Sequence, residues 1–177
     1  MIFKRQSGVA LFISLVLLLV LTIIGISSVQ TTSLEVRMTR NEHDSVLAFQ
    51  AAESALRDAE ARLETIVSTA GFTPGGSGGL YTVAEIGDEE NWRDPGIWEG
   101  GNSIRAETEV AGVAEQPRYI IEHAASVLRE ENAYQLEDPY ATASGDRIEV
   151  FRVTARASGG TTASQVMLQS SYGRILN

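Results

Sequence analysis

The chain has 177 residues and a formal net charge of -9 at pH 7, with 23 acidic residues against 14 basic ones. An acidic chain lacks the clustered cations that bind a phosphate backbone, so the composition argues against a nucleic-acid partner. The absence of cysteine excludes disulfide bonds and thiolate metal sites, and the length suits one folded domain with an N-terminal segment.

The N-terminal segment contains a long apolar run. No charged residue occurs between Arg5 and Glu35, and residues 9–26 are apolar apart from Ser14, Thr22 and Gly25. A helix of about eighteen residues rises roughly 27 Å, close to the ~30 Å hydrocarbon core of a bilayer. A secretion signal cleaved after residues 25–27 is the alternative, but such signals usually have a shorter apolar core. The run therefore predicts a helix that spans a membrane.

The helical pattern continues beyond the apolar run. Residues 31–70 contain neither proline nor glycine, whereas Gly71 and Pro74 supply a stop. The pattern predicts one continuous helix from about residue 10 to residue 70, whose second half is apolar on one side. The apolar stripe, with spacings of three and four, consists of Phe49, Ala52, Leu56, Ala59, Leu63, Ile66 and Ala70.

A short cationic leader precedes this helix. Lys4 and Arg5 are followed by Gln6-Ser7-Gly8, and the combination of leader and helix resembles the type IV pilin family. The resemblance implies that a prepilin peptidase cleaves between Gly8 and Val9 and that the new N-terminus at Val9 is methylated. Gly8, which has no side chain, suits a peptidase that closes around the backbone. The two cations predict a cytoplasmic N-terminus and a periplasmic head by the positive-inside rule.

Within that family, two stretches are similar to the PilX-type minor pilins. They are GVALFISLVLLLVLTIIGISSVQTTSLEVRM and LAFQAAESALRDAEARL, and FRVTARASGGTTASQVMLQSSYGR near the C-terminus is a weaker likeness. The resemblance implies an α+β, pilin-like fold in which a long N-terminal helix packs on an antiparallel sheet. The expected divisions are a leader at 1–8, a transmembrane or filament-core helix at 9–30, an amphipathic helix at 31–70 and a β-rich head with a C-terminal hairpin at 71–177.

One position departs from the family pattern. Most pilins carry a glutamate at the fifth mature position, and counting from Val9 that position is Ile13. In the family, the implied partner of this glutamate is the N-terminal amine of a neighbouring subunit, and Ile13 cannot form that pair. By analogy with the glutamate-lacking pseudopilin of type II secretion, the hypothesis is a subunit that starts or caps a filament.

The preferred function is therefore that of a structural minor pilin, not an enzyme, in a type IV pilus that supports twitching motility and adhesion. The implied partners are other minor and major pilins, the prepilin peptidase, the inner-membrane assembly platform and a tip-associated adhesin. The chain would lie in the inner membrane before assembly and near the pilus tip afterwards, without a cofactor. Two alternatives stay open: a minor pseudopilin of type II secretion, and a bitopic inner-membrane protein whose periplasmic head binds a ligand or acts enzymatically.

Residues 88–102 gather acidic side chains around two tryptophans. One interpretation is a surface loop pinned by Trp92 and Trp98, with a turn that begins at Asp94. The other is a partner-binding or calcium-binding loop, because carboxylates and aromatic anchors serve such sites. The spacing fits no EF-hand.

Other motifs that could carry chemistry are weak. The GGSGG run at 75–79 predicts a flexible connection, and it matches the nucleophile-elbow pattern with Ser77 at its centre. An elbow needs a strand before it and a helix after it, and only His43 and His123 could serve as the base. Both histidines stand beside acidic residues, which favours solvated or capping roles over a metal site. No catalytic or metal-binding residue is assigned.

The head is predicted to be mostly strand. β-Formers and alternating apolar residues mark residues 118–124, 147–157 and 164–172, with a hairpin turn at 158–161. An antiparallel sheet with one buried face fits this pattern, and the stripe of the helix would cover that face. A short helix is predicted at 127–132 and a loop at 136–144.

Overall fold

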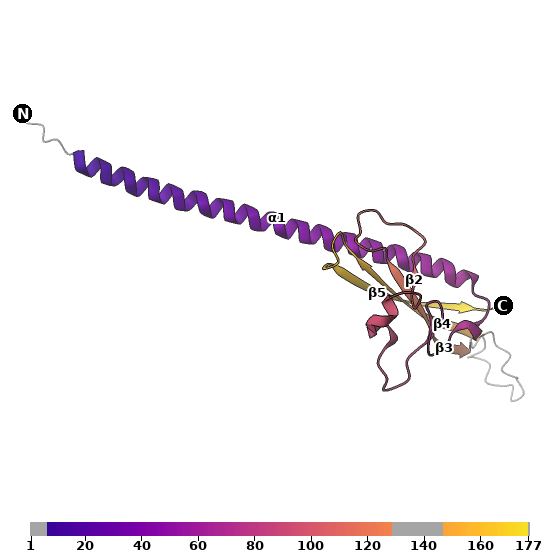
Figure 1. The fold of residues 1–177 in the computed structure, drawn as a ribbon. Coiled ribbons are helices and arrows are strands. Elements are labelled where there is room, and N and C mark those ends of the chain that lie inside the picture. Colours follow the sequence, from indigo (N-terminus) through magenta and orange to yellow (C-terminus); the bar gives the residue numbers. More distant parts are fainter. Residues whose placement is uncertain (1–6, 129–146, 177) are drawn as a thin grey trace, which may run out of the picture. The chain divides into compact units, whose positions relative to one another are not determined.

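The computed structural model describes residues 7–128 and 147–176 (Figure 1). The chain divides into two compact units, Met1–His43 and Asp44–Asn177. Helix α1 (Ser7–Thr65) contains the described part of the first unit and enters the second. Lys4 and Arg5, which were predicted to orient the leader, lie outside the described residues, as does the predicted loop at 136–144.

The second unit is a mixed sheet with α1 on one face (Figure 1). The strand order is β1-β3-β4-β5, and β2 also pairs with β3. The pairings of β3 with β2 and β4, and of β4 with β5, are antiparallel as predicted, but β1 pairs with β3 in parallel. The strands are β1 (Leu80–Thr82), β2 (Ile104–Arg105), β3 (Arg118–Leu128), β4 (Arg147–Ser158) and β5 (Gln165–Ile175).

Two predicted boundaries differ from the structure. The α-helix ends at Thr65 instead of residue 70, because Arg174 from β5 donates hydrogen bonds to the carbonyls of Leu63 and Ile66 and so satisfies the end of the helix. Residues 127 and 128 belong to β3 and not to a helix, since pairing with β4 resumes after a bulge at His123/Ala125 and continues to the end of the strand. The rest of that predicted helix lies outside the described residues.

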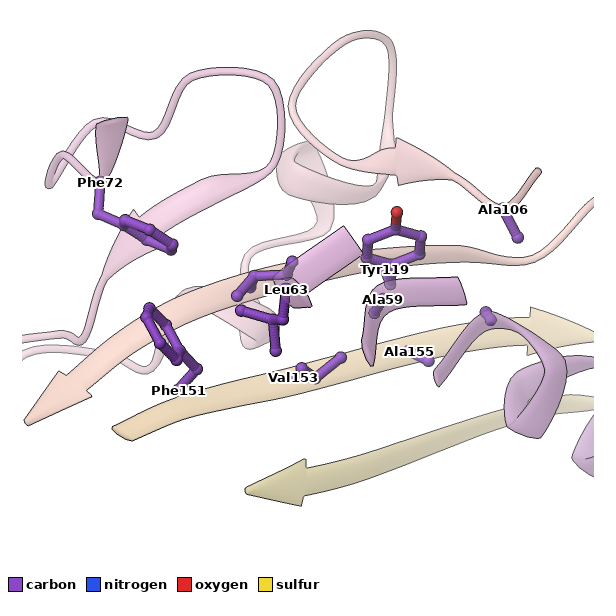
Figure 2. Packing of buried hydrophobic residues seen from close by; sticks show 10 residues of the cluster. Ala59, Leu63, Phe72, Ala106, Tyr119, Phe151, Val153 and Ala155 are labelled. Carbon is purple, nitrogen blue, oxygen red and sulfur yellow. The ribbon is translucent and has the colours of Figure 1, made fainter. Parts of the chain in front are cut away.

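The core lies between α1 and the sheet, as predicted from the stripe. Leu63 and Ala59 of α1 pack over Tyr119 of β3 and over Phe151 and Val153 of β4 (Figure 2). Burying each large apolar side chain contributes about 1.5–3 kcal/mol relative to leaving it exposed. The fully buried residues of α1 are mostly small and include Ala48, Ala51, Ala52, Ala55 and Ala59.

The predicted stripe is wrong at its first and last members. Ala70 is exposed and lies beyond α1, in the short helix η1 (Thr69–Gly71). Phe49 is 49% exposed, whereas its neighbour Ala48 is completely buried. A helix buries the side that its neighbours approach most closely, and here that side is lined by alanines, so the larger Phe49 is left on the flank.

The GGSGG segment is not the flexible connection that its composition predicted. Gly76 and Gly79 have positive φ angles of 64° and 80°, and Ser77 forms a backbone bridge with Leu80. A Cβ atom at Gly76 would lie 2.0 Å from the ring of Tyr81, and one at Gly79 would lie 2.6 Å from Ile104. The glycines therefore permit a tight turn that packs on the sheet.

Candidate functional site

The first candidate surface is the apolar part of α1. Its side chains are exposed throughout the described part of the first unit, including Val9 at 57% and Ile13 at 52%. The helix is long and apolar enough to cross a membrane. Its hydroxyl groups bond back to the helix, as Thr22 does to the carbonyl of Leu18 at 2.7 Å and Ser27 to that of Ile23 at 2.9 Å. In a hydrocarbon environment polar groups must form their hydrogen bonds within the protein, as these hydroxyl groups do.

The predicted processing point lies at the beginning of this surface. Gly8 and Val9 are in the first turns of α1, and both are exposed. A Cβ atom added at Gly8 would meet no atom within 4 Å. Packing in the described chain therefore does not require a glycine at this position, and cleavage after Gly8 stays a prediction.

The second candidate surface is the tryptophan loop, residues 88–102, with the short helices η2 (Asn91–Arg93) and η3 (Pro95–Trp98). Ile97 and Trp98 pack with Tyr81 and Ile120 in one apolar cluster. Since Tyr119 and Ile121 belong to the cluster under α1, the alternation of a strand places Ile120 on the opposite face of the sheet. The loop therefore covers the second face (Figure 1).

The three residues proposed for partner binding have structural contacts. Trp98 is 7% exposed, and its Nε1 donates a hydrogen bond of 2.9 Å to the carbonyl of Trp92. Asp94 caps η3 by accepting a hydrogen bond of 2.8 Å from the backbone N–H of Gly96. These contacts support the interpretation of a pinned loop. Trp92 is only half-buried, so part of it stays available to a partner.

A buried ionic network attaches this loop to the sheet. Glu122 is completely buried and accepts a hydrogen bond of 2.8 Å from Nε of Arg152 and one of 2.8 Å from the amide of Asn91. Arg152 also donates to Glu90 at 2.6 Å. Burial lowers the pKa of Arg152, but its bonds with Glu122 and Glu90 outweigh that effect and raise the pKa above its usual value.

A second polar cluster lies at the far end of β3 and β4. Nε2 of His123 is 2.6 Å from a carboxylate oxygen of Glu149, and the hydroxyl of Ser126 donates to the other oxygen at 2.8 Å. Partial burial raises the pKa of Glu149, but the hydrogen bonds from His123 and Ser126 outweigh it and hold the pKa below its usual value. The imidazole also packs on Phe151, with ring centroids 5.6 Å apart.

Acidification is expected to destabilise the second unit partly through Glu149. Because its folded-state pKa is lowered, the stability it contributes is present above its unfolded pKa of about 4.3 and is lost as the pH falls through the folded pKa. Urea unfolding between about pH 5 and pH 3 should show a shallower loss of stability for Glu149→Gln than for the wild type. Glu89→Gln, at an exposed position, is the control. Identical slopes for wild type and Glu149→Gln would contradict the prediction.

The remaining candidate residues do not form a catalytic or metal site in the part of the chain that the structure describes. Ser77 precedes a strand and not a helix, so the nucleophile-elbow geometry is not met. His43 is exposed on α1, whereas His123 is engaged with Glu149. Residues 7–128 and 147–176 contain no cluster of three or more histidine or acidic side chains suited to a metal ion.

A cavity of about 330 Å³ lies beside the tryptophan loop, with Trp98, Arg118 and Arg156 among its lining residues. Arg118 donates hydrogen bonds to the carbonyl of Gly100, which lies in the loop, and to the hydroxyl of Ser103, the next residue after the loop, at 2.7 Å. Arg156 lies over the ring of Trp98, 5.8 Å from its centroid. These two arginines therefore secure the loop.

The sequence interpretation missed the ionic residues that attach the loop. Glu122 follows Ile120 in the alternation of β3, and a polar residue at that position ordinarily faces water. The only available signal was the presence of two tryptophans in the loop, because aromatic side chains need an apolar surface to cover.

Comparison with known families gives two matches that together cover most of the chain. The model described as PilX N-terminal matches residues 7–57, and the model described as Type IV pilus assembly protein PilX C-term matches residues 41–174. Neither the curated proteins nor the solved structures give a match.

Proposed function

The chain belongs to the PilX family of type IV pilus proteins, and from this premise we propose that it is a minor pilin that helps to initiate or cap the filament. The family is structural and not enzymatic. In the proposal the apolar part of α1 holds the subunit in the inner membrane before assembly and in the filament core afterwards. The β-rich head would be periplasmic first and lie near the pilus tip later.

The observation that carries this proposal is the residue at position 13. An exposed isoleucine stands where most pilins have the glutamate that pairs with a neighbour's N-terminal amine. A carboxylate near the middle of a bilayer costs about 2.5–3.5 kcal/mol on insertion scales, so it is retained where a partner neutralises it. A subunit without this carboxylate lacks the pairing that docks it beneath an assembled neighbour. The first subunit of a filament has no such neighbour.

The substitution Ile13→Glu tests this role. If the missing carboxylate keeps the subunit at the filament end, the variant should become distributed along the filament, and the number of pili per cell should fall. Immunogold labelling and pilus counts measure the two effects. Ile13→Gln, which adds polarity without charge, is the matched control and should behave like the wild type. Unchanged labelling and unchanged pilus numbers for Ile13→Glu would remove the support for a tip role.

The proposed partners follow from this assembly role. They are the prepilin peptidase that processes the Gly8–Val9 bond and methylates Val9, the inner-membrane assembly platform, other minor and major pilins, and a tip-associated adhesin. The proposed contributions to twitching motility and adhesion depend on these contacts. The proposed orientation depends on Lys4 and Arg5, which keep the N-terminus cytoplasmic.

The second candidate is a minor pseudopilin of a type II secretion system. The same absence of a glutamate at Ile13 favours it, since a pseudopilus also needs a first subunit. A deletion strain separates the two functions: loss of twitching motility supports the pilus, and loss of protein secretion with normal twitching supports the pseudopilus.

A further inference from the structure

The free edge of β5 lacks the features that usually protect an edge strand. β5 is the last strand of the sheet, and within the described residues no strand pairs with its second edge. Its register with β4 runs without a shift from Ile148↔Ile175 to Ser158↔Gln165, so no bulge twists the edge away. Residues 165–173 contain no charge and no proline. Natural edges are ordinarily blunted by such bulges, charges or prolines.

The apolar layer between α1 and the sheet is also open beside the free edge of β5. Val166, Leu168 and Tyr172 alternate on the face of β5 that packs towards α1, and all three are only partly buried. A further strand beside β5 would cover them with its own alternate side chains.

One flank of α1 borders the same opening. The hydroxyl of Tyr172 donates to Glu64, and Nε of Arg174 lies 3.9 Å from the same carboxylate, which places the Glu64 flank on the β5 side. Residues at spacings of three and four share a flank of a helix, so Phe49 and Leu56 belong to it. The opposite flank carries Asp58, which binds Thr108 in the segment between β2 and β3. Thus the exposed Phe49 lies on the side of the free edge.

The same flank carries more acidic than basic side chains, and this favours one kind of partner. Glu53, Glu60 and Glu64 lie on it. Arg57 pairs with Glu53 at 2.5 Å and Arg174 lies 3.9 Å from Glu64, whereas Glu60 has no ion pair among the described residues. A second copy that paired its β5 antiparallel with this one would bring its own Glu60 to the same interface, and like charges across an interface are unfavourable. A different polypeptide with basic residues at the same place is favoured by charge complementarity.

We propose that the free edge of β5 accepts an added strand from a different polypeptide. The donated segment is extended, has apolar side chains at alternate positions, has no acidic residue and carries lysine or arginine beside Glu60. Its backbone pairs with Gln165–Gly173, as in other cases of strand addition, and its apolar side chains cover Phe49 and Leu56. This binding surface is independent of position 13, so it stands or falls separately from the role in initiation.

The proposal is tested with the full chain in detergent micelles and a labelled peptide of about nine residues, alternating threonine and valine with a lysine at each end. Fluorescence anisotropy measures binding, and amide hydrogen exchange shows where the peptide lies. We expect slower exchange in β5 and an affinity that falls about tenfold when glutamates replace the lysines. Gln169→Lys, on the exposed face of β5, should weaken binding, whereas the control Ala111→Lys, at an exposed position in the segment between β2 and β3, should not.

Three results would overturn the proposal. The first is unchanged amide exchange in β5 at saturating peptide. The second is equal binding of a peptide with a central proline, which cannot maintain a strand ladder. The third is tighter binding of a peptide that copies Gln165–Ile175, because that would identify a second copy of the chain as the occupant. Pilus counts do not enter this test, so its failure is distinguishable from failure of the assembly role.

Discussion

Replacing Glu122 with alanine is expected to lower the free energy of unfolding of the second unit by about 3–5 kcal/mol. The carboxylate is completely buried, and it is held by Arg152 and by the amide of Asn91. Its removal leaves the guanidinium of Arg152 without its buried partner, although the side chain of Arg152 is only 20% exposed. The desolvation of that charge is then uncompensated, which is the main source of the loss.

Urea unfolding measures this effect, with tryptophan fluorescence as the signal. Trp92 and Trp98 are the chain's two tryptophans, and both lie in the loop that the network attaches, so their emission also reports detachment of the loop. Glu90→Ala removes the second carboxylate that pairs with Arg152. Because the side chain of Glu90 is 40% exposed, this change should lower the free energy of unfolding by no more than about 1 kcal/mol.

A paired substitution separates the charge from the shape of the site. Glu122→Leu together with Arg152→Leu removes both charges, so its cost should be smaller than the sum of the two single changes. A Glu122→Ala cost equal to that of Glu90→Ala would contradict a buried network.

The periodic parts of the chain were predictable from the sequence. Spacings of three and four indicated α1, and alternation indicated β3, β4 and β5, because both patterns follow from how each element buries one side. The exposed position of Phe49 was not predictable in this way. Phe49 and Ala48 are adjacent apolar residues, and the choice between them depends on how closely the sheet approaches the helix.

Contacts between distant segments account for what the sequence did not reveal. Glu122 is buried because residues 88–102, far away in the chain, cover its face of the sheet. The end of α1 at Thr65 depends on Arg174, more than a hundred residues later. The parallel pairing of β1 with β3 depends on the turn at Gly76 and Gly79, whose composition alone indicated only flexibility.

The N-terminal end of the chain offers the other large effect. Gly8→Val is expected to abolish processing, so that the chain keeps residues 1–8, gains no methyl group on Val9 and does not enter filaments. The physical reason is that a peptidase at the membrane surface must close around the backbone at this position, and a branched side chain obstructs it. Intact mass of the protein extracted from membranes of a cell with an active prepilin peptidase measures the result.

The structure makes this variant a clean test, because there is open space beside Gly8 for an added side chain. A Cβ atom there meets no atom within 4 Å, and the position is exposed at the beginning of α1. Valine costs a helix less than about 1 kcal/mol relative to alanine, so helix formation survives the change. Ser7→Val adds the same side chain one residue earlier and should still be cleaved. Normal cleavage of Gly8→Val would mean that the glycine is not a processing determinant. A wild-type chain that retains residues 1–8 would instead indicate an uncleaved bitopic anchor.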